Sequence, residues 1–405
     1  MRIAHVAHTY LPAFGGAEAV IHHLARHQMT EHHPVVIVRW NRRRTRHAKL
    51  GYPVVPLLPT TMRHALRHDH RARWRLLIAA QVCLLQRRFR FDLWHFHNSY
   101  PDGWAMVPVL DAMGVPSVFT SHGGDLPLLA AAAGGDQRDP RRADRAREAC
   151  TRFGGVVAIS NTIERYYGEV GVDPARIRRI PNGVDVTRLG RRSDEDRAAA
   201  RRELGVHGPV LLTVGNESVE KGVDLVPAIA DALNRSATPF TWLVIGPSTE
   251  PAWATRLPDN VRLLARREPG FDDSPLVLPT DAMVTLFHAA DVQVVPSRAE
   301  GLPLAVLEGM AAGLPFVSTD APGCVDLIEH GVNGLVSALD DVEALAENIA
   351  RLLAAPDERA AFGAASRLRT HDWNTVAEQY EAFYRDVIDR TGPPRPKRHG
   401  SASRV

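Results

Sequence analysis

Short runs of apolar residues recur along the chain, and a turn or a polar loop follows most of them. Such runs are typical of strands that are buried on both faces of a parallel sheet. They cover residues 2–7, 32–40, 91–97, 116–122 and 155–160, and then 209–215, 240–246, 260–265, 291–297 and 315–320. The pattern therefore predicts two series of strands, one in each half of the chain.

Longer segments with apolar residues at helical spacing lie between these predicted strands. They cover residues 17–29, 70–88, 101–113 and 161–170, and then 222–235, 280–290, 303–312 and 341–354. Strands that alternate with helices form βαβ units and parallel sheets. The sequence therefore predicts an α/β protein with two doubly wound domains.

The two series meet in the polar segment 176–205, where Asn182-Gly183 supplies a turn and a charged helical stretch follows. We therefore expect an N-terminal domain over residues 1–186 and a C-terminal domain over residues 187–373.

A last helix is predicted at about 374–390. Its apolar residues recur at helical spacing and should form one buried stripe: Val376, Tyr380, Phe383, Tyr384 and Val387. The tail 391–405 is rich in proline, glycine, serine and basic residues, so we expect it to be disordered.

Charge divides the chain in the same way as the strand pattern. The formal net charge is +3, but residues 1–186 hold 26 basic and 15 acidic side chains, and the remaining residues hold 23 and 31. The basic half suits an anionic membrane, an anionic acceptor or the phosphates of a nucleotide. No recognised nucleic-acid-binding module accompanies the charge, so we expect no nucleic-acid partner.

Cysteine content and hydropathy predict the compartment. The three cysteines are widely spaced, which argues against a disulfide framework and fits a reducing cytosol. No stretch approaches the ~20 apolar residues of a membrane span, and the N-terminus lacks the pattern of a signal peptide. We therefore expect a cytoplasmic protein, with peripheral contact at the inner membrane face as an open alternative.

The segment 62–91 bears on that alternative. It holds eight arginines and a single acid, Asp69, around an apolar centre. Such a segment is either a buried helix with basic flanks, which we favour, or a helix that lies on a membrane surface.

One lysine stands out in a chain that otherwise uses arginine. Of the 49 lysines and arginines, only Lys49, Lys221 and Lys397 are lysines. Lys221 lies in "VGNESVEKGVD", between a predicted strand and a predicted helix. A lysine offers a compact point charge that the fork of an arginine does not reproduce.

The segment 291–323, "DVQVVPSRAEGLPLAVLEGMAAGLPFVSTDAPG", carries the strongest functional pattern. A strand ends at Pro296, and Pro303 is placed as the first residue of a helix that runs to Gly313. Free N–H groups at such a helix start suit a phosphate. Glu300 and Glu308 instead accept hydrogen bonds from the hydroxyl groups of a sugar or ribose.

Loops at the carboxyl ends of parallel strands form the ligand sites of open α/β sheets. If the two domains face each other, five such loops converge on one cleft: residues 8–16, 121–125, 215–221, 246–249 and 297–303.

The two glutamates of "EGLPLAVLE" resemble the E-x7-E signature of the retaining glycosyltransferases of family 4, which have the GT-B fold. Further motifs in the family's order extend the resemblance over nearly the whole chain. They are "GGAE" at 15–18, "TSHGGD" at 120–125, "IPNGVD" at 180–185, "VEKGVD" at 219–224 and "HGVNGLV" at 330–336. The resemblance implies a C-terminal helix that returns to the first domain.

The resemblance also implies roles for residues at the matching positions. Glu308 would bind the ribose of a nucleotide-sugar, Glu300 the transferred sugar, and Lys221 the diphosphate, while His122 would lie near the reacting carbon. The catalytic candidates are thus His122, Lys221 and Glu300. The other donor-side candidates are Gly15, Gly16, Asn216, Gly246, Arg266, Arg298, Gly301, Leu302 and Leu304, and the acceptor-side candidates are His97 and Asp125.

The implied reaction moves a hexose-type sugar from an NDP-sugar, with UDP as the expected nucleotide, to a hydroxyl group of a glycan, a lipid-linked molecule or a small molecule. Backbone and cationic donors would stabilise the leaving diphosphate. The expected route is same-face, without a protein nucleophile, metal or other cofactor. A sugar-nucleotide epimerase-like enzyme, or a catalytically degenerate nucleotide-sugar-binding protein, remains the alternative.

Three departures from the family pattern bear on the donor site. Asn216 replaces a common arginine, Pro303 cannot donate a backbone N–H, and Asp326 stands where the family has a glutamate. Arg298 is the candidate second cation.

Two further polar features have competing interpretations. His95 and His97 alternate along a strand and could hold a metal, but no third ligand is nearby in the sequence, so we expect them to line or pack in the cleft. Asp125 would contact the acceptor or the sugar, or cap a helix.

Overall fold

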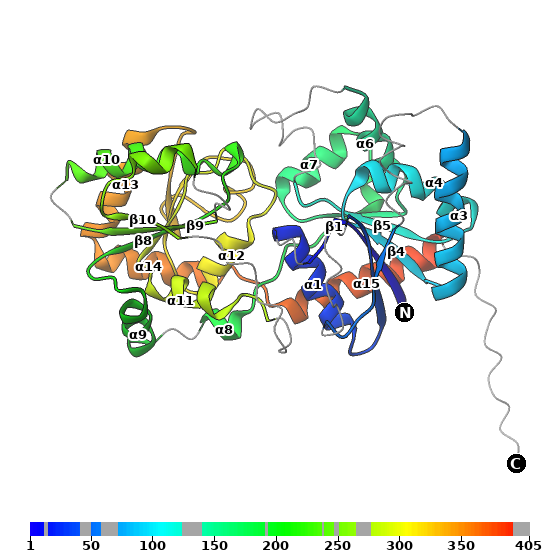
Figure 1. Ribbon diagram of the computed structural model, residues 1–405, viewed down its shortest axis with the longest axis horizontal. Helices are drawn as coiled ribbons and strands as arrows, with labels where there is room; N and C mark the ends of the chain where they lie inside the picture. Colours follow the sequence, from blue (N-terminus) through cyan, green and yellow to red (C-terminus); the bar gives the residue numbers. More distant parts are fainter. Residues whose placement is uncertain are drawn as a thin grey trace, which may run out of the picture.

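The computed structural model describes residues 1–11, 15–40, 50–57, 72–123, 140–190, 193–236, 239–246, 251–264 and 277–391. Two sheets stand side by side with helices around them, and each forms a Rossmann-like domain (Figure 1). This confirms the predicted GT-B architecture. The tail that we expected to be disordered lies, apart from Thr391, outside the described residues.

The N-terminal sheet has seven strands in the order β3-β2-β1-β4-β5-β6-β7. Every pairing within it is parallel. Its strands are β1 (Arg2–Thr9), β2 (His33–Trp40), β3 (Val54–Pro56), β4 (Leu93–Phe96), β5 (Ser117–Thr120), β6 (Gly155–Ala158) and β7 (Ile177–Arg179).

The C-terminal sheet has six strands in the order β10-β9-β8-β11-β12-β13, again all parallel. Its strands are β8 (Val210–Val214), β9 (Thr241–Ile245), β10 (Val261–Leu264), β11 (Val292–Val295), β12 (Phe316–Thr319) and β13 (Gly334–Ser337). The sequence pattern missed β3, β7 and β13. All three are short strands at sheet edges, where a continuous apolar run is not required.

Helices cover the sheets and match the eight predicted segments closely. In the N-terminal half they are α1 (Gly16–Gln28), α3 (Ala72–Phe89), α4 (Trp104–Ala112), α6 (Pro140–Arg152), α7 (Asn161–Glu169) and α8 (Val186–Gly190). The remaining ones are α9 (Asp194–Leu204), α10 (Val226–Asn234), α11 (Asp281–Ala289), α12 (Leu304–Ala311), α13 (Val342–Ala354), α14 (Pro356–Arg367) and α15 (Trp373–Thr391).

Short helical turns complete the described structure. They are η2 (Ser99–Gly103), η3 (Pro174–Arg176), η4 (Val219–Lys221), η5 (Val223–Leu225) and η6 (Ala252–Arg256). Of these, η4 carries Lys221.

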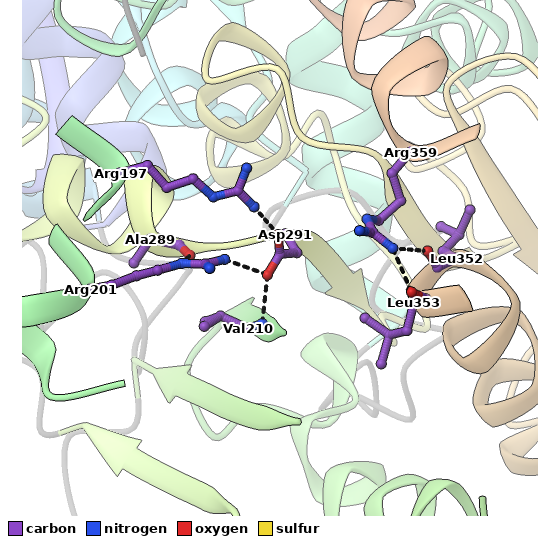
Figure 2. Close-up of polar contacts among 8 residues, drawn as sticks. All are labelled: Arg197, Arg201, Val210, Ala289, Asp291, Leu352, Leu353 and Arg359. Carbon is purple, nitrogen blue, oxygen red and sulfur yellow. Dashed lines mark hydrogen bonds and ion pairs between the residues drawn. The ribbon is translucent and has the colours of Figure 1, made fainter. Parts of the chain in front are cut away.

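The charged stretch that follows the first domain forms α9, which is anchored by ion pairs. Asp291, at the start of β11, is nearly buried and pairs with Arg197 and Arg201 of α9 (Figure 2). The same carboxylate accepts a hydrogen bond of 2.7 Å from the backbone N–H of Val210. A buried carboxylate requires such partners, so Asp291 fixes the helix to the ends of two strands.

The last helix returns to the first domain, as the family resemblance implied. It starts at Trp373, whose ring stacks on His23 of α1 at 4.5 Å between centroids, and it runs back beneath the N-terminal sheet (Figure 1). The predicted stripe is buried, with Tyr380, Tyr384 and Val387 fully inaccessible. The return helix therefore belongs to the core of the N-terminal domain.

Helix α3, with which the described part of the arginine-rich segment begins, is buried on one face only, and residues 62–71 of that segment lie outside the described residues. One face packs on the domain through Ile78 and Val82, whereas Leu76, Leu77 and Leu84 are 68%, 55% and 66% exposed. Within the described residues, no helix is long and apolar enough to cross a membrane.

Candidate functional site

The loop between β11 and α12 holds the first glutamate of the E-x7-E pair. The Glu300 carboxylate is only 9% exposed and receives Lys221 Nζ at 2.8 Å from each of its oxygens. Ser297 Oγ donates a third hydrogen bond, of 2.9 Å, to Oε1. Three contacts therefore hold Glu300 in one orientation, and the predicted cation lies directly beside it.

Close backbone packing brings Lys221 to Glu300. Gly222 has a φ of +61°, and a Cβ atom there would lie 1.9 Å from the carbonyl oxygen of Pro296. A glycine at this position therefore lets η4 rest directly on the end of β11. The lysine of "VEKG" is thus carried to the C-terminal edge of the sheet, as the sequence suggested.

The Arg298 side chain binds residues of neighbouring loops. Its guanidinium binds both Asp224 oxygens at 2.9 Å, Asp340 at 2.7 Å and the carbonyl oxygen of Val219 at 2.8 Å. Asp224, followed by Asp340, raises the pKa of Arg298 above its ordinary value. These contacts give Arg298 a structural task, namely to clamp the turn that carries Lys221. Its role as a second diphosphate cation stays a prediction.

Asn216 also has a local partner. Its side-chain oxygen accepts a hydrogen bond of 3.2 Å from the N–H of Ser218, which is an Asx turn. Nearby, Gly246 has a φ of +134°, and a Cβ atom there would lie 2.2 Å from the carbonyl oxygen of Gly215. Only backbone fits between the ends of β8 and β9, which keeps this part of the donor-side loop region compact.

Glu308 differs from Glu300 in having no partner. It lies on α12, largely buried, and its carboxylate makes no hydrogen bond or ion pair within the described part of the chain. Burial raises the pKa of Glu308 to about 8. A carboxylate with unused acceptor capacity is suited to hydroxyl donors such as those of ribose.

Helix α12 begins one residue later than expected. Pro303 is its N-cap, with extended backbone, and Leu304 is the first helical residue. The helix ends as predicted, because Gly313 has a φ of +74° just after its last turn. The Val306 N–H donates to the carbonyl oxygen of Pro303 at 3.1 Å, whereas the N–H groups of Leu304 and Ala305 have no partner within the described residues and remain available.

The donor-side candidates Gly301, Leu302 and Leu304 lie where the two domains touch, and this contact region forms the seam between the domains. A Cβ atom on Gly301 would lie 2.5 Å from the carbonyl oxygen of His122, so the two backbones touch. The Leu302 carbonyl accepts a hydrogen bond of 3.2 Å from Asn182 Nδ2 of the "IPNG" segment. Leu304 packs on an apolar cluster that includes Tyr10 of the N-terminal domain. The structure therefore brings the predicted segments together.

Gly15 and Gly16 lie at the N-terminus of α1, where Gly15 is the N-cap. A Cβ atom on Gly15 would meet the Glu18 carboxylate at 2.7 Å, whereas one on Gly16 would meet nothing within 4 Å. The Glu18 carboxylate is the far end of a flexible side chain and Gly15 has extended backbone with a φ of −150°, so the fold strictly requires a glycine at neither position. Asp125 and Arg266 lie outside the described residues.

A histidine cluster lies behind this seam. His122 Nε2 lies 3.0 Å from His97 Nδ1, and His97 Nε2 lies 3.0 Å from Nδ1 of His5 in β1. A third histidine, distant from His95 and His97 in the sequence, is therefore near them in space, because β1 pairs with β4 and places His5 beside His95. Ring nitrogens of His5, His95 and His97 lie within 4.8 Å of one another, close enough to hold a metal ion.

Some residues of the site had weak or no sequence signals. Asp326 reaches across the seam and accepts hydrogen bonds from the Asn161 N–H at 2.8 Å and from Thr162 Oγ1 at 3.0 Å. Ser297 lies three residues before Glu300, and no motif in the sequence singles it out as a site residue. His5 could have been noticed, since a polar ring interrupts the apolar strand "RIAHVA".

Two family models match the chain: Glycosyltransferase Family 4 over residues 14–188 and Glycosyl transferases group 1 over residues 208–355. A D-inositol 3-phosphate glycosyltransferase of Acidothermus cellulolyticus is 32% identical over 68% of this chain and 63% of its own length, just under two thirds. That of Saccharomonospora viridis is 30% identical, over 74% of this chain and 70% of its own. An alpha-maltose-1-phosphate synthase of Mycolicibacterium smegmatis is also 30% identical, over 68% and 74%.

Solved structures share the fold over almost the full chain. Anabaena Alr3699/HepE in complex with UDP and glucose has a TM-score of 0.74 at 20% identity, over 94% of this chain and 98% of that one. WaaG, a glycosyltransferase involved in lipopolysaccharide biosynthesis, has a TM-score of 0.70 at 20% identity, over 95% and 99%. At such identities the likeness concerns the fold.

Proposed function

Because this chain belongs to the family 4 glycosyltransferases, we propose that it transfers a hexose-type sugar from a UDP-sugar to a hydroxyl acceptor with retention of configuration. The observation that carries the proposal is the Lys221–Glu300 pair, together with the unpartnered Glu308 on the helix that follows Glu300. A cation suits a diphosphate, and two carboxylates suit the hydroxyl groups of sugar and ribose. The choice of UDP is supported by the nucleotide named for a structural neighbour.

In this mechanism the bond between the sugar's anomeric carbon and the phosphate oxygen breaks, and the bonding electrons leave with UDP. Lys221 and the first N–H groups of α12 stabilise the charge that develops on the diphosphate. The acceptor oxygen attacks the same face of the sugar, and a leaving phosphate oxygen takes its proton. Glu300, held by Lys221 and Ser297, orients the sugar. The route uses the protein's own cation, and a donor site without metal stays part of the proposal.

For the acceptor, we favour a small polyol that carries a phosphate group. Two relatives are named for action on D-inositol 3-phosphate. The N-terminal half, on the acceptor side of the seam, holds 26 basic against 15 acidic residues, and this excess favours the approach of an anionic molecule from a distance, whatever groups line the site itself. Glycan and lipid-linked acceptors are the alternatives against which the acceptor assay compares it.

The proposal is tested in two steps with purified protein. A thermal-shift screen with UDP, GDP and ADP should show the largest stabilisation with UDP, and no stabilisation by any nucleotide would favour a degenerate site. UDP-glucose, UDP-galactose and UDP-N-acetylglucosamine are then incubated with and without inositol phosphate. Conversion of the donor's sugar without an acceptor would indicate the epimerase alternative, and a product of inverted configuration would refute retention.

We also propose peripheral contact with an anionic membrane through α3. Leu76, Leu77 and Leu84 are exposed on α3, and Arg87 and Arg88 are exposed near the end of the same helix. Apolar and basic side chains on one helix favour an anionic membrane surface. Sedimentation with phosphatidylglycerol vesicles should fall when Leu76 and Leu84 are both changed to Ser, with transfer to a soluble acceptor retained. Equal sedimentation of both proteins would remove the membrane from the proposal.

A further inference from the structure

A line of hydrogen-bonded side chains runs from the core of the N-terminal domain to its seam with the other domain. Gln28 Oε1, at the end of α1, lies 2.8 Å from His5 Nε2. His5 Nδ1 lies 3.0 Å from His97 Nε2, and His97 Nδ1 lies 3.0 Å from His122 Nε2. The three rings come from, or directly follow, the adjacent strands β1, β4 and β5.

The line has a direction if each ring is neutral. A neutral imidazole carries one proton, so one nitrogen donates and the other accepts. Burial lowers the pKa of His5 and of His122 to about 4, and it holds the pKa of His97 well below its ordinary value. At neutral pH each of the three rings therefore has one donor and one acceptor.

An amide oxygen can only accept, so Gln28 requires the proton of His5 to be on Nε2. His5 Nδ1 is then an acceptor, which requires the proton of His97 to be on Nε2 as well. The same step at the next contact puts the proton of His122 on Nε2. The remaining nitrogen, His122 Nδ1, is left with a lone pair and has no partner in the described part of the chain.

We propose that Gln28 sets the tautomer of His122 through His5 and His97, so that His122 Nδ1 serves as a hydrogen-bond acceptor for a hydroxyl group of the bound sugar. The proposal rests on the proposed function. Gln28, His5 and His97 are positioning residues, because they act only through His122. His122 is partly exposed at the seam, with its carbonyl oxygen against Gly301 of the opposite domain. His97 binds the Nε2 atom of His122, and Nδ1 is the other nitrogen of the same ring.

A purely structural role and a metal site both fit the histidine line less well. A structural core would be more stable with apolar residues, because each buried polar group needs a partner. A metal at His5, His95 and His97 would have to displace existing hydrogen bonds, since every ring nitrogen of these three residues already has a protein partner. The two nitrogens of His95 bind Thr120 at 2.8 Å and Tyr384 at 2.7 Å.

The tautomers can be measured without any substrate. In protein labelled with ¹⁵N-histidine, the nitrogen resonances show which ring nitrogen carries the proton, and His122 is assigned by comparison with a His122→Asn variant. We expect His5, His97 and His122 each to be protonated on Nε2. A proton on His122 Nδ1, or a stoichiometric metal in the purified protein, would overturn the proposal. This outcome is independent of transferase activity, so it separates failure of the relay from failure of the proposed function.

A second variant tests the consequence for catalysis. Gln28→Met keeps the size of the side chain but removes the acceptor, so His122 should show mixed tautomers. Transfer from the accepted UDP-sugar should slow by about tenfold in kcat at unchanged donor KM, the rate equivalent of one hydrogen bond. Tyr52→Phe is the matched control, since it removes buried hydrogen bonds to Tyr10 and to His22 of α1 but touches no member of the relay. Equal rates in the two variants, or unchanged His122 resonances in Gln28→Met, would refute the relay.

Discussion

The two domains present different polar groups where they meet, and these two facing surfaces form an N-terminal wall and a C-terminal wall. On the N-terminal side, the polar groups next to Gly301 are neutral histidine rings, His122 and His97, which are joined by a hydrogen bond. On the C-terminal side the polar groups are ions, with Lys221 paired to Glu300 and Arg298 paired to Asp224. The N-terminal half nevertheless has the basic excess and the C-terminal half the acidic one.

The contrast shows that the net charge of a domain does not predict the charge of its site. A charge that develops during bond breaking is best met by fixed ions close by, whereas hydroxyl groups need only oriented donors and acceptors. The C-terminal wall fixes its ions through Gly222 and Arg298, and the N-terminal wall orients its rings through one another. Each variant below removes one polar group from these two surfaces.

The largest effect should follow Lys221→Ala. The change removes the cation of the C-terminal wall and leaves the Glu300 carboxylate with Ser297 alone. We expect kcat/KM for the UDP-sugar to fall by about a hundredfold or more, as on removal of a group that stabilises a developing anion. Steady-state kinetics with the accepted donor measures the effect.

Lys221→Arg tests whether another cation can replace the lysine. Lys221 Nζ lies 2.8 Å from both Glu300 oxygens, and the planar fork of an arginine would meet this carboxylate with a different geometry. We expect an activity between those of the wild type and the alanine variant. Arg235→Ala is the control, because its ion pair with Glu343 is exposed on both sides. Near-normal turnover in both Lys221 variants would mean that the lysine does not meet the diphosphate.

The sequence predicted the C-terminal wall better than the N-terminal one. Glu300, Lys221 and their loop stand out because a glycine, a lysine and an E-x7-E spacing are visible along a single stretch of chain. The partners of these residues are not visible in that way. Asp340 binds Arg298 from 42 positions away, and only the meeting of two loops at the sheet edge creates that contact.

The histidine line was hidden for a related reason. Its members are separated by 92 and 25 positions, and only the strand order β1-β4-β5 brings them together. The sequence predicted all three of these strands but not which ones are neighbours. It also showed Asn216 where the family commonly has an arginine, and in the structure this uncharged side chain stabilises a turn.

The next effect concerns pH and the unpartnered carboxyl. The pKa of Glu308 is raised to about 8 from an ordinary value of 4.5, so the folded protein holds an extra proton between these two pH values. The free energy of unfolding should therefore fall as pH rises from about 4.5 to 8, and Glu308→Gln should lessen this fall. Chemical denaturation at several pH values measures the difference.

The same carboxyl should make donor binding depend on pH. Hydroxyl groups of ribose bind the ionised form, so UDP affinity should rise by up to about tenfold per pH unit below the pKa. Calorimetry of UDP binding to Glu308→Gln should lack this part of the rise while retaining any that comes from UDP itself. Glu347→Gln, an exposed residue on α13, is the control. An identical pH dependence in the wild type and in Glu308→Gln would exclude Glu308 from the ribose site.

The smallest effect should come from the contact that joins the two walls. The Asp326 side chain is 3% exposed and holds the start of α7 across the seam, with Arg179 3.8 Å away. Asp326→Ala should loosen the contact between the two domains and raise the donor KM by about fivefold, the equivalent of one net hydrogen bond. Small-angle scattering should show a larger radius of gyration. Asp386→Ala, which removes an ion pair to Arg178 that is half exposed on both sides, should change neither quantity. An unchanged KM and radius in Asp326→Ala would mean that the walls meet through Gly301 and Leu302 without this carboxylate.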